Sequence, residues 1–146
     1  LLLGINMHDM YNLTSANVID GRLEYVRLKT SKKYSVLLQP EAIALLEKYK
    51  GKERLLSFCE DYASYPSFAN SFNHALRTVR EGLTSYYARY SWASIAFNLG
   101  ISKDVVSLAL GHSFGVRVTD TYINADLSRV DNANRKVIDW VLYGRK

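Results

Sequence analysis

The sequence predicts a mainly α-helical domain with one small antiparallel β-sheet near its start, an α+β class. Beyond Pro40, apolar residues recur at the helical spacing of three and four, whereas the preceding region alternates polar and apolar residues around Asp20-Gly21. The length of 146 residues supports one domain, covering 1–146, with a single core. A composition of 48% hydrophobic and 23% charged residues excludes intrinsic disorder.

Several functional classes are excluded by composition. No apolar run approaches the roughly 20 residues that cross a bilayer, and the opening Leu1-Leu2-Leu3-Gly4 lacks the basic flank and cleavage site of a signal peptide. The single cysteine, Cys59, excludes an internal disulfide framework and a multi-cysteine zinc site. His8, His74 and His112 are far apart and lack metal-ligand spacing. We therefore expect a reducing compartment, and the opening LLLGIN suggests a piece of a longer protein.

The first third of the chain predicts a short helix followed by a three-stranded meander. Met7 to Leu13 has the apolar stripe of a helix end, and Asp20-Gly21 is a two-residue turn signal between extended runs. Leu23 to Lys29 alternates, Thr30 to Lys33 is a polar turn, and Tyr34 to Leu38 is the third strand. Because residues i and i+2 of a strand point to one face, this places Arg27 beside Lys29.

The rest of the chain is expected to be helical. Proline is favoured in a first helical turn, and glycine often follows a last turn. The predicted helices are Pro40 to Tyr49, Glu53 to Tyr62, Ser67 to Glu81, Thr84 to Leu99, Ser102 to Leu110 and Leu127 to Tyr143. The last has an apolar stripe of Val130, Val137, Trp140 and Val141, which either packs on its own domain or docks on a neighbouring protomer.

Positive charge is concentrated in the predicted hairpin. The net charge is +5, and between Gly21 and Leu38 five basic residues face a single acid, Glu24. The basic residues are Arg22, Arg27, Lys29, Lys32 and Lys33. Such a patch favours a polyanion partner, nucleic acid ahead of an anionic membrane surface, with Arg22, Lys32 and Lys33 as candidate contacts to DNA phosphates. A solvated basic hairpin without a partner is the alternative.

Three segments carry the strongest functional signal: TSYYARYSW at 84–92, LALGHSFG at 108–115 and VTDTYIN at 118–124. Their order and spacing resemble the tyrosine recombinase, or phage-type integrase, family. The phrases GINMHDMYNL and RLKT are similar to integrases of conjugative and transposable elements of Bacteroides-like bacteria. The resemblance extends over the whole chain, as a catalytic domain without the family's N-terminal DNA-binding domains.

This resemblance implies the DNA breaking-rejoining fold and a site-specific DNA recombinase, which integrates and excises a mobile element through a 3′-phosphotyrosyl intermediate, with type IB topoisomerase-like chemistry. Covalent storage of the bond energy removes the need for ATP, and no metal or other cofactor is expected. The implied partner is double-stranded attachment-site DNA, on which a protein monomeric in isolation forms a homotetramer with accessory DNA-bending proteins. No membrane is implied, and the implied location is the bacterial cytoplasm, at the nucleoid.

The resemblance also implies roles for individual residues. Tyr122 takes the nucleophile position, and Arg89 that of an arginine that binds the scissile phosphate bidentately. His112 matches a further phosphate donor, and Lys29 matches the lysine that protonates the leaving 5′-oxygen. Thr84, at the start of the same segment as Arg89, is an expected DNA contact.

Two positions depart from the family pattern. Tyr86 replaces the histidine of His-x-x-Arg; a phenol can donate a hydrogen bond to phosphate but is a poor general base near pH 7. Asn6 replaces the arginine of Gly-x-Arg-x-x-Glu/Asp and supplies no charge, which makes Arg27 a candidate substitute. Both departures favour an alternative function, a DNA-binding relative that has lost strand cleavage. A topoisomerase of the same chemistry is another alternative.

Overall fold

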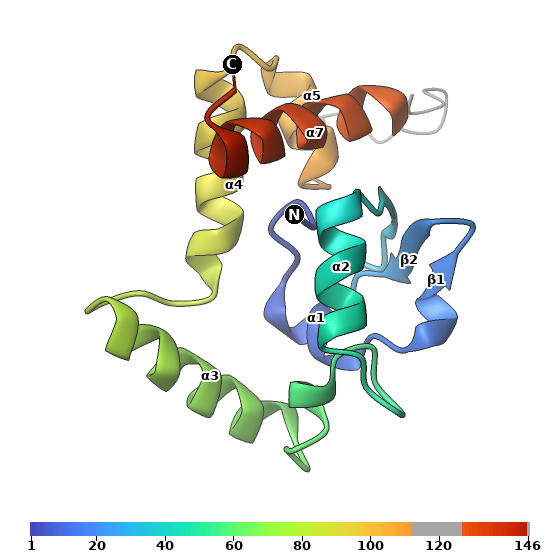
Figure 1. Cartoon of the computed structure of the whole chain (residues 1–146), viewed down its shortest axis with the longest axis vertical. Coiled ribbons are helices and arrows are strands. Elements are labelled where there is room, and N and C mark those ends of the chain that lie inside the picture. Colours follow the sequence, from blue (N-terminus) through green and yellow to red (C-terminus); the bar gives the residue numbers. More distant parts are fainter. Residues whose placement is uncertain (112–126, 146) are drawn as a thin grey trace.

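The computed structural model describes residues 1–111 and 127–145, which form a mixed α+β fold (Figure 1). The helices are α1 (Met7–Asn12), α2 (Pro40–Lys48), α3 (Tyr65–Val79), α4 (Tyr86–Asn98), α5 (Lys103–Ala109) and α7 (Leu127–Tyr143). The strands are β1 (Val18–Ile19), β2 (Arg22–Val26) and β3 (Lys33–Leu37), and short 3-10 turns span Ser15–Asn17 and Ser57–Cys59. In Figure 1, α4, α5 and α7 form the upper part of the molecule, while α1, α2 and the sheet lie below α7.

The predicted three-stranded meander is confirmed. The strands pair antiparallel in the order β1-β2-β3, and Asp20 and Gly21 both take positive φ (48° and 74°) in the turn between the first two. However, β2 ends at Val26, three residues earlier than expected. Arg27 closes the next turn with its own backbone, since its N–H donates to the Lys32 carbonyl (2.8 Å) and its carbonyl accepts from the Ser31 N–H (2.8 Å).

This early end corrects the expected positions of the basic side chains. Arg27 and Lys29 lie in the turn and are not two members of one strand face. The side chain of Arg27 is directed inward and is only 13% exposed, whereas Lys29 is exposed to solvent. Alternation stops to predict side-chain direction once the backbone leaves the extended conformation.

Most of the predicted helices are confirmed, with boundaries that differ by a few residues. The residue that flanks α4 is Ser85, one position after the expected Thr84. Gly100 and Gly111 directly follow the last residues of α4 and α5 with φ of +77° and +63°, the left-handed conformation that ends many helices.

The predicted helix from Glu53 to Tyr62 is wrong, because this segment contains only a 3-10 turn at Ser57–Cys59. The Glu60 carboxylate accepts the backbone N–H groups of Glu53 (2.7 Å) and Arg54 (2.8 Å), so a side chain satisfies donors that a helix would satisfy with its own carbonyls. The local hydrogen bonds of Glu60 therefore replace the helix that apolar spacing predicted.

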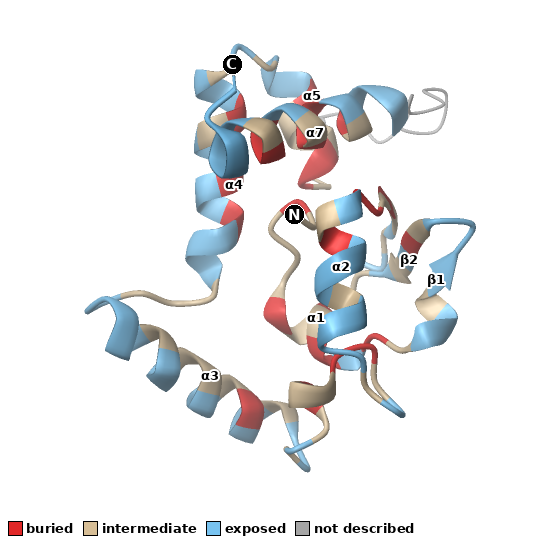
Figure 2. Ribbon diagram, viewed as in Figure 1, coloured by how far each residue is buried: buried red, intermediate tan, exposed pale blue. Residues whose placement is uncertain are grey.

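Helix α7 packs on its own domain, against α4, α5 and β3. Its buried face consists of Val130, Ala133, Asn134, Val137 and Ile138 (Figure 2). The expected stripe was partly wrong, because Trp140 and Val141 are 41% and 53% exposed. The indole N–H of Trp92 on α4 donates to the Asn134 Oδ1 (3.0 Å), which fixes the register between the two helices.

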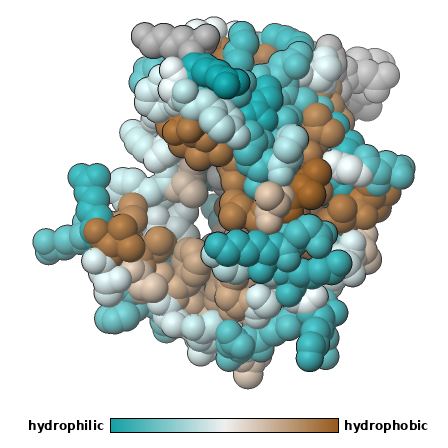
Figure 3. Space-filling view, viewed as in Figure 1, coloured by the Kyte–Doolittle hydropathy of each residue, from teal (hydrophilic) through white to brown (hydrophobic). Residues whose placement is uncertain are grey.

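Polar residues cover much of the face seen in Figure 3, with apolar groups between them. Two of the apolar side chains that predicted helix α2, Ile43 and Leu45, are exposed, while Ala42 is the buried contact of that helix. Over residues 1–111 and 127–145, no helix has the length and apolar character that crossing a bilayer requires.

Candidate functional site

Arg89 lies on the buried face of α4, together with Trp92 and Ala96. The side chain of an arginine rarely sits in a core without a partner, yet Arg89 is only 8% exposed. Sequence reasoning placed it at the edge of a stripe containing Ala88. The structure instead exposes Ala88 and turns Arg89 inward.

Gly4 allows the N-terminal segment to lie directly against Arg89. A Cβ atom at Gly4 would stand 2.2 Å from the Arg89 Cα, and the φ of +60° is one that other residues rarely adopt. This close approach places the start of α1 beside α4. Asn6, Tyr86 and Arg89 consequently line one small pocket, whose wall also includes Tyr65 and Ser85.

The carbonyl oxygen of Leu110, the residue that ends α5, accepts hydrogen bonds from three side chains. The donors are Tyr34 Oη (2.7 Å), Arg27 Nη1 (3.5 Å) and Arg89 Nη2. They come from β3, from the turn after β2 and from α4. One oxygen atom therefore brings together two guanidinium groups from segments more than 60 residues apart, Arg27 and Arg89.

The charges of this cluster are unbalanced. The buried Asp9 carboxylate faces Arg27 (Oδ2 to Nε, 3.9 Å) and accepts the Leu28 N–H (3.0 Å). Among the described residues, no carboxylate lies within ion-pair distance of Arg89. Two guanidinium groups thus share one carboxylate and the negative end of a short helix. A buried cation without a counter-ion is costly, so the arrangement favours an anionic ligand.

Tyr25 and Tyr34 stack beside this cluster, with ring centroids 5.2 Å apart and planes inclined by 18°. Burial raises the pKa of Tyr25 well above that of a free phenol, and the nearby Tyr34 and Asp9 raise it further, against the opposing effect of Arg89 and Arg27. Tyr25 is therefore a neutral phenol throughout the physiological range. The stacked pair forms a rigid, uncharged wall behind the two arginines.

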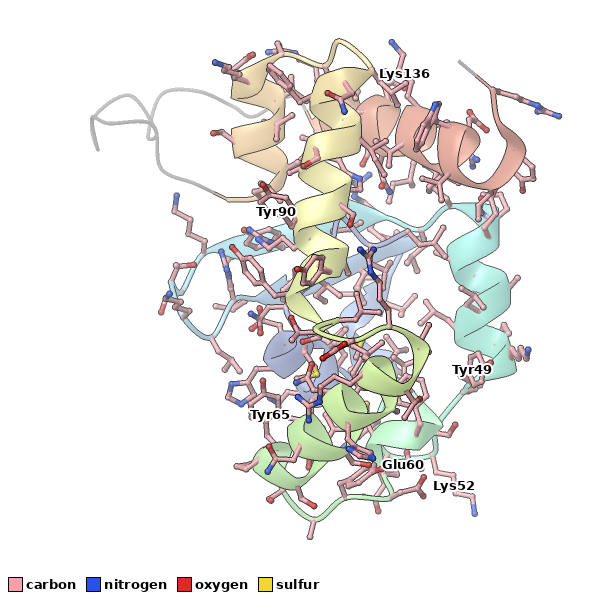
Figure 4. All side chains as sticks on the ribbon, turned by 90° about the vertical axis from the view of Figure 1, so that its left-hand side faces the viewer. Tyr49, Lys52, Glu60, Tyr65, Tyr90 and Lys136 are labelled. Atoms are coloured by element: carbon pink, nitrogen blue, oxygen red, sulfur yellow. The ribbon has the colours of Figure 1, made fainter. Side chains whose placement is uncertain are left out.

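His8 and Asn6 organise the start of α1 next to the pocket. The Asn6 Oδ1 accepts the His8 N–H (2.9 Å) and so caps the helix, while the His8 ring stacks on Tyr65 at a centroid distance of 3.8 Å. Figure 4 shows Tyr65 in the lower half of the molecule and Tyr90 on α4, which crosses in front of the sheet. The pocket lies where α1, the start of α3 and the start of α4 meet.

The other residues expected at the site are distributed unevenly. Tyr86 is 65% exposed at the rim of the pocket, beside Asn6 and Arg89. Lys29 is exposed in its turn and does not line the pocket. His112 and Tyr122 belong to 112–126, which lies outside the described residues.

The four expected DNA contacts also differ from one another. Arg22 forms a bidentate pair with Asp131 of α7 (2.9 and 3.1 Å) and donates to Ser35, so a structural role accounts for it. Lys33 is exposed at the start of β3, and Lys32 is half-buried before it. Thr84 is half-buried, and its carbonyl accepts the Tyr87 N–H (3.0 Å) in the first turn of α4.

Sequence reasoning missed three residues of this cluster: Asp9, Tyr34 and Leu110. Asp9 occupies the acidic position of the Gly-x-Arg-x-x-Glu/Asp pattern, which is a signal that could have identified it. Tyr34 had only a place in a predicted strand, and the role of Leu110 belongs to its backbone, which no side-chain pattern can reveal.

In the described part of the chain, no three His, Cys, Asp or Glu side chains are grouped as metal ligands would be. Comparison with models of protein families, with curated proteins and with solved structures finds no match.

Proposed function

We propose that the chain is the catalytic domain of a tyrosine recombinase, a site-specific recombinase that cuts and rejoins DNA through a 3′-phosphotyrosyl intermediate. The observation that carries this proposal is the convergence of Arg27 and Arg89 on one oxygen atom with a single carboxylate between them. A phosphodiester offers two anionic oxygens to such a pair and compensates the excess charge better than a carbonyl does.

In this proposal the two arginines bind the non-bridging oxygens of the scissile phosphate. Negative charge grows on those oxygens in the transition state, and donors fixed in advance stabilise it. Arg27 takes the place of the family's missing first arginine, since Asn6 carries no charge. Tyr86, at the pocket rim beside Arg89, donates its phenolic O–H to the same phosphate in place of a histidine.

The chemical step is a transesterification. The phenolate oxygen of Tyr122 attacks phosphorus, a new O–P bond forms, and the bond from phosphorus to the 5′-oxygen breaks. The ammonium group of Lys29 gives its proton to that leaving oxygen, and His112 donates a hydrogen bond to the phosphate. Because Lys29 is exposed in the turn after β2, the turn must close onto bound DNA before this proton transfer.

The proposal also covers partners and setting. The substrate is an attachment site in double-stranded DNA, and four copies of the protein act on two duplexes, with accessory DNA-bending proteins. The reaction would integrate and excise a mobile element in the bacterial cytoplasm. The exposed Lys33 and the basic turn before it supply sequence-independent contacts to the DNA backbone.

A second candidate function is DNA binding without cleavage, and the replacements at Asn6 and Tyr86 favour it. The decisive experiment uses a pool of nicked duplexes with a randomised centre. In such duplexes the short fragment that bears the 5′-hydroxyl diffuses away after cleavage and leaves the covalent protein–DNA adduct. The intact protein is expected to form an adduct that survives denaturation, and sequencing of the retained DNA gives the preferred site.

Three variants assign the result. Tyr122→Phe must abolish the adduct, because a phenyl ring has no nucleophile. Lys29→Ala should slow cleavage much more than it weakens binding, since one phosphate contact among many has little weight in affinity. An intact protein that binds a duplex but forms no adduct would support the binding-only function, whereas relaxation of plasmids of any sequence would indicate a topoisomerase.

A further inference from the structure

Tyr34 is fixed on both of its ends. Its ring stacks on Tyr25, and its hydroxyl donates to the Leu110 carbonyl at 2.7 Å. Gly111 lies directly over that hydroxyl: a Cβ atom there would be 1.7 Å from Tyr34 Oη, and the φ of Gly111 is +63°. Strand β3 and the end of α5 therefore meet at the Tyr34 hydroxyl, one peptide before the segment that begins with His112.

The hydrogen bonds of the Leu110 carbonyl pose a problem for phosphate binding. Arg27 and Arg89 both donate to this oxygen, so they must leave it, at least in part, to bind an anion. Leu110 is 7% exposed, and a buried carbonyl that loses all its donors is costly. Tyr34 is the one donor of the three that is neutral and cannot follow an anion, because its ring is held by Tyr25.

We propose that Tyr34 is a positioning residue for phosphate binding at the Arg27–Arg89 pair: its hydroxyl keeps the Leu110 carbonyl hydrogen-bonded when both arginines turn to the anion. This inference rests on the proposed function, since the anion is the scissile phosphate of DNA. It adds a residue that acts through Arg89 and touches neither phosphate nor nucleophile. Without the hydroxyl, the carbonyl retains the arginines and competes with the phosphate.

The test compares Tyr34→Phe with Tyr25→Phe in the intact protein. The two substitutions remove one hydroxyl each from the same stacked pair, but only Tyr34 donates to Leu110. On a nicked duplex recovered from the pool, Tyr34→Phe should form the covalent adduct roughly tenfold more slowly, the effect of one lost hydrogen bond. The Kd for the same duplex and the melting temperature should stay close to those of Tyr25→Phe.

A double-mutant cycle separates positioning from a general structural role. In an Arg89→Lys background, which keeps a cation, Tyr34→Phe should have less than about a twofold further effect, because it acts through the hydrogen bond of Arg89. Full additivity of the two substitutions would overturn the inference. Equal cleavage rates of Tyr34→Phe and Tyr25→Phe would overturn it too, and so would a parallel loss of binding, cleavage and melting temperature.

A measurement without cleavage keeps the inference testable if no adduct forms. Binding of inorganic phosphate, titrated by calorimetry at constant ionic strength, should be roughly tenfold weaker in Tyr34→Phe and unchanged in Tyr25→Phe. An adduct in the wild type with no difference between the variants defeats the role of Tyr34 alone. A wild type that forms no adduct and binds no phosphate defeats both the proposed function and this inference.

Discussion

Two clusters of arginine in this molecule differ in how their charge is compensated. On the face between α2 and α7, Arg135 donates to both Glu41 oxygens (2.8 and 2.9 Å) and to Asp139 (2.9 Å), and Tyr143 donates to Glu41 (2.8 Å). At the Leu110 carbonyl, by contrast, two guanidinium groups share one carboxylate. The first cluster has every charge answered within the chain, and the second does not.

This difference distinguishes a structural cluster from a binding site. Paired carboxylates stabilise Arg135 in the folded chain without any ligand, and the cluster holds α7 to α2. Arg89 is more deeply buried than Arg135 but has only a carbonyl as partner among the described residues. A fold that keeps a buried guanidinium in this state loses stability, and such losses concentrate at functional sites.

The largest expected effect is the opposite response of the two clusters to the loss of arginine. Arg89→Met should reduce adduct formation by about 10²–10³, the usual effect of one lost transition-state donor. It should leave the melting temperature unchanged or raise it, because an apolar chain of similar length replaces an uncompensated buried cation. Thermal unfolding and adduct assays on the same preparation measure both effects.

The matched control is Arg135→Met. It leaves Glu41 and Asp139 without their cation, so the melting temperature should fall by a few degrees, corresponding to about 1 kcal/mol. Adduct formation should change by less than about twofold. A destabilised Arg89→Met with normal cleavage would reverse the comparison and remove the basis for a phosphate site.

The next effect concerns which cation completes the site. Arg27→Ala should slow cleavage strongly, and adding Asn6→Arg should restore part of the rate, because position 6 lines the same pocket as Arg89. The rescue is partial because Asn6 also caps α1 at the His8 N–H, and losing that cap costs about 1 kcal/mol. Full activity of Arg27→Ala, or no rescue by Asn6→Arg, would exclude Arg27 as the substitute.

The fold was predictable to the extent that local signals determine it. The Asp20-Gly21 turn, Pro40 at the start of α2 and the apolar period of α7 predicted these elements within a few residues. The segment from Glu53 to Tyr62 was not predictable in this way. Its conformation depends on the Glu60 carboxylate bonding to backbone groups six and seven residues earlier, which apolar spacing does not encode.

The site was predictable only where chemistry resides in side-chain patterns. The resemblance selected Arg89, Arg27 and Tyr86, and the structure brings Arg89 together with each of the other two. It could not reveal that a backbone oxygen of Leu110 is the meeting point. It also placed Lys29 beside Arg27, because the end of β2 is set by hydrogen bonds between Arg27 and the far side of the turn.

A smaller effect tests how the uncompensated cluster is held in place. Gly4→Ala should destabilise the protein by roughly 2–4 kcal/mol, because a methyl group would overlap the Arg89 backbone at an unfavourable φ. Gly21→Ala is the control, with a similar φ of +74° and no atom within 4 Å of the added Cβ, and should cost about 1 kcal/mol. Equal chemical denaturation midpoints would show that Gly4 does not set the contact.

The smallest expected effect is the pH dependence of the compensated cluster. The hydrogen bond from Arg135, together with those from its own backbone and from Tyr143, lowers the pKa of Glu41 from 4.5 to about 2. A carboxyl group whose pKa is lower in the folded state stabilises the fold above its unfolded pKa. That contribution is therefore present above pH 4.5 and is lost as the pH falls through about 2.

Melting temperatures of the wild type and Glu41→Gln measure this contribution between pH 7 and pH 2. The difference between the two should be constant from pH 7 to about pH 5 and should shrink towards zero by about pH 2. Glu47→Gln, on the same helix and paired only with exposed Lys50 at 3.8 Å, should show little difference at any pH. A difference that persists unchanged at pH 2 would mean that Glu41 acts through packing or neutral hydrogen bonds. Arg135 would then not be held by charge, and only the Arg27–Arg89 side of the comparison would remain electrostatic.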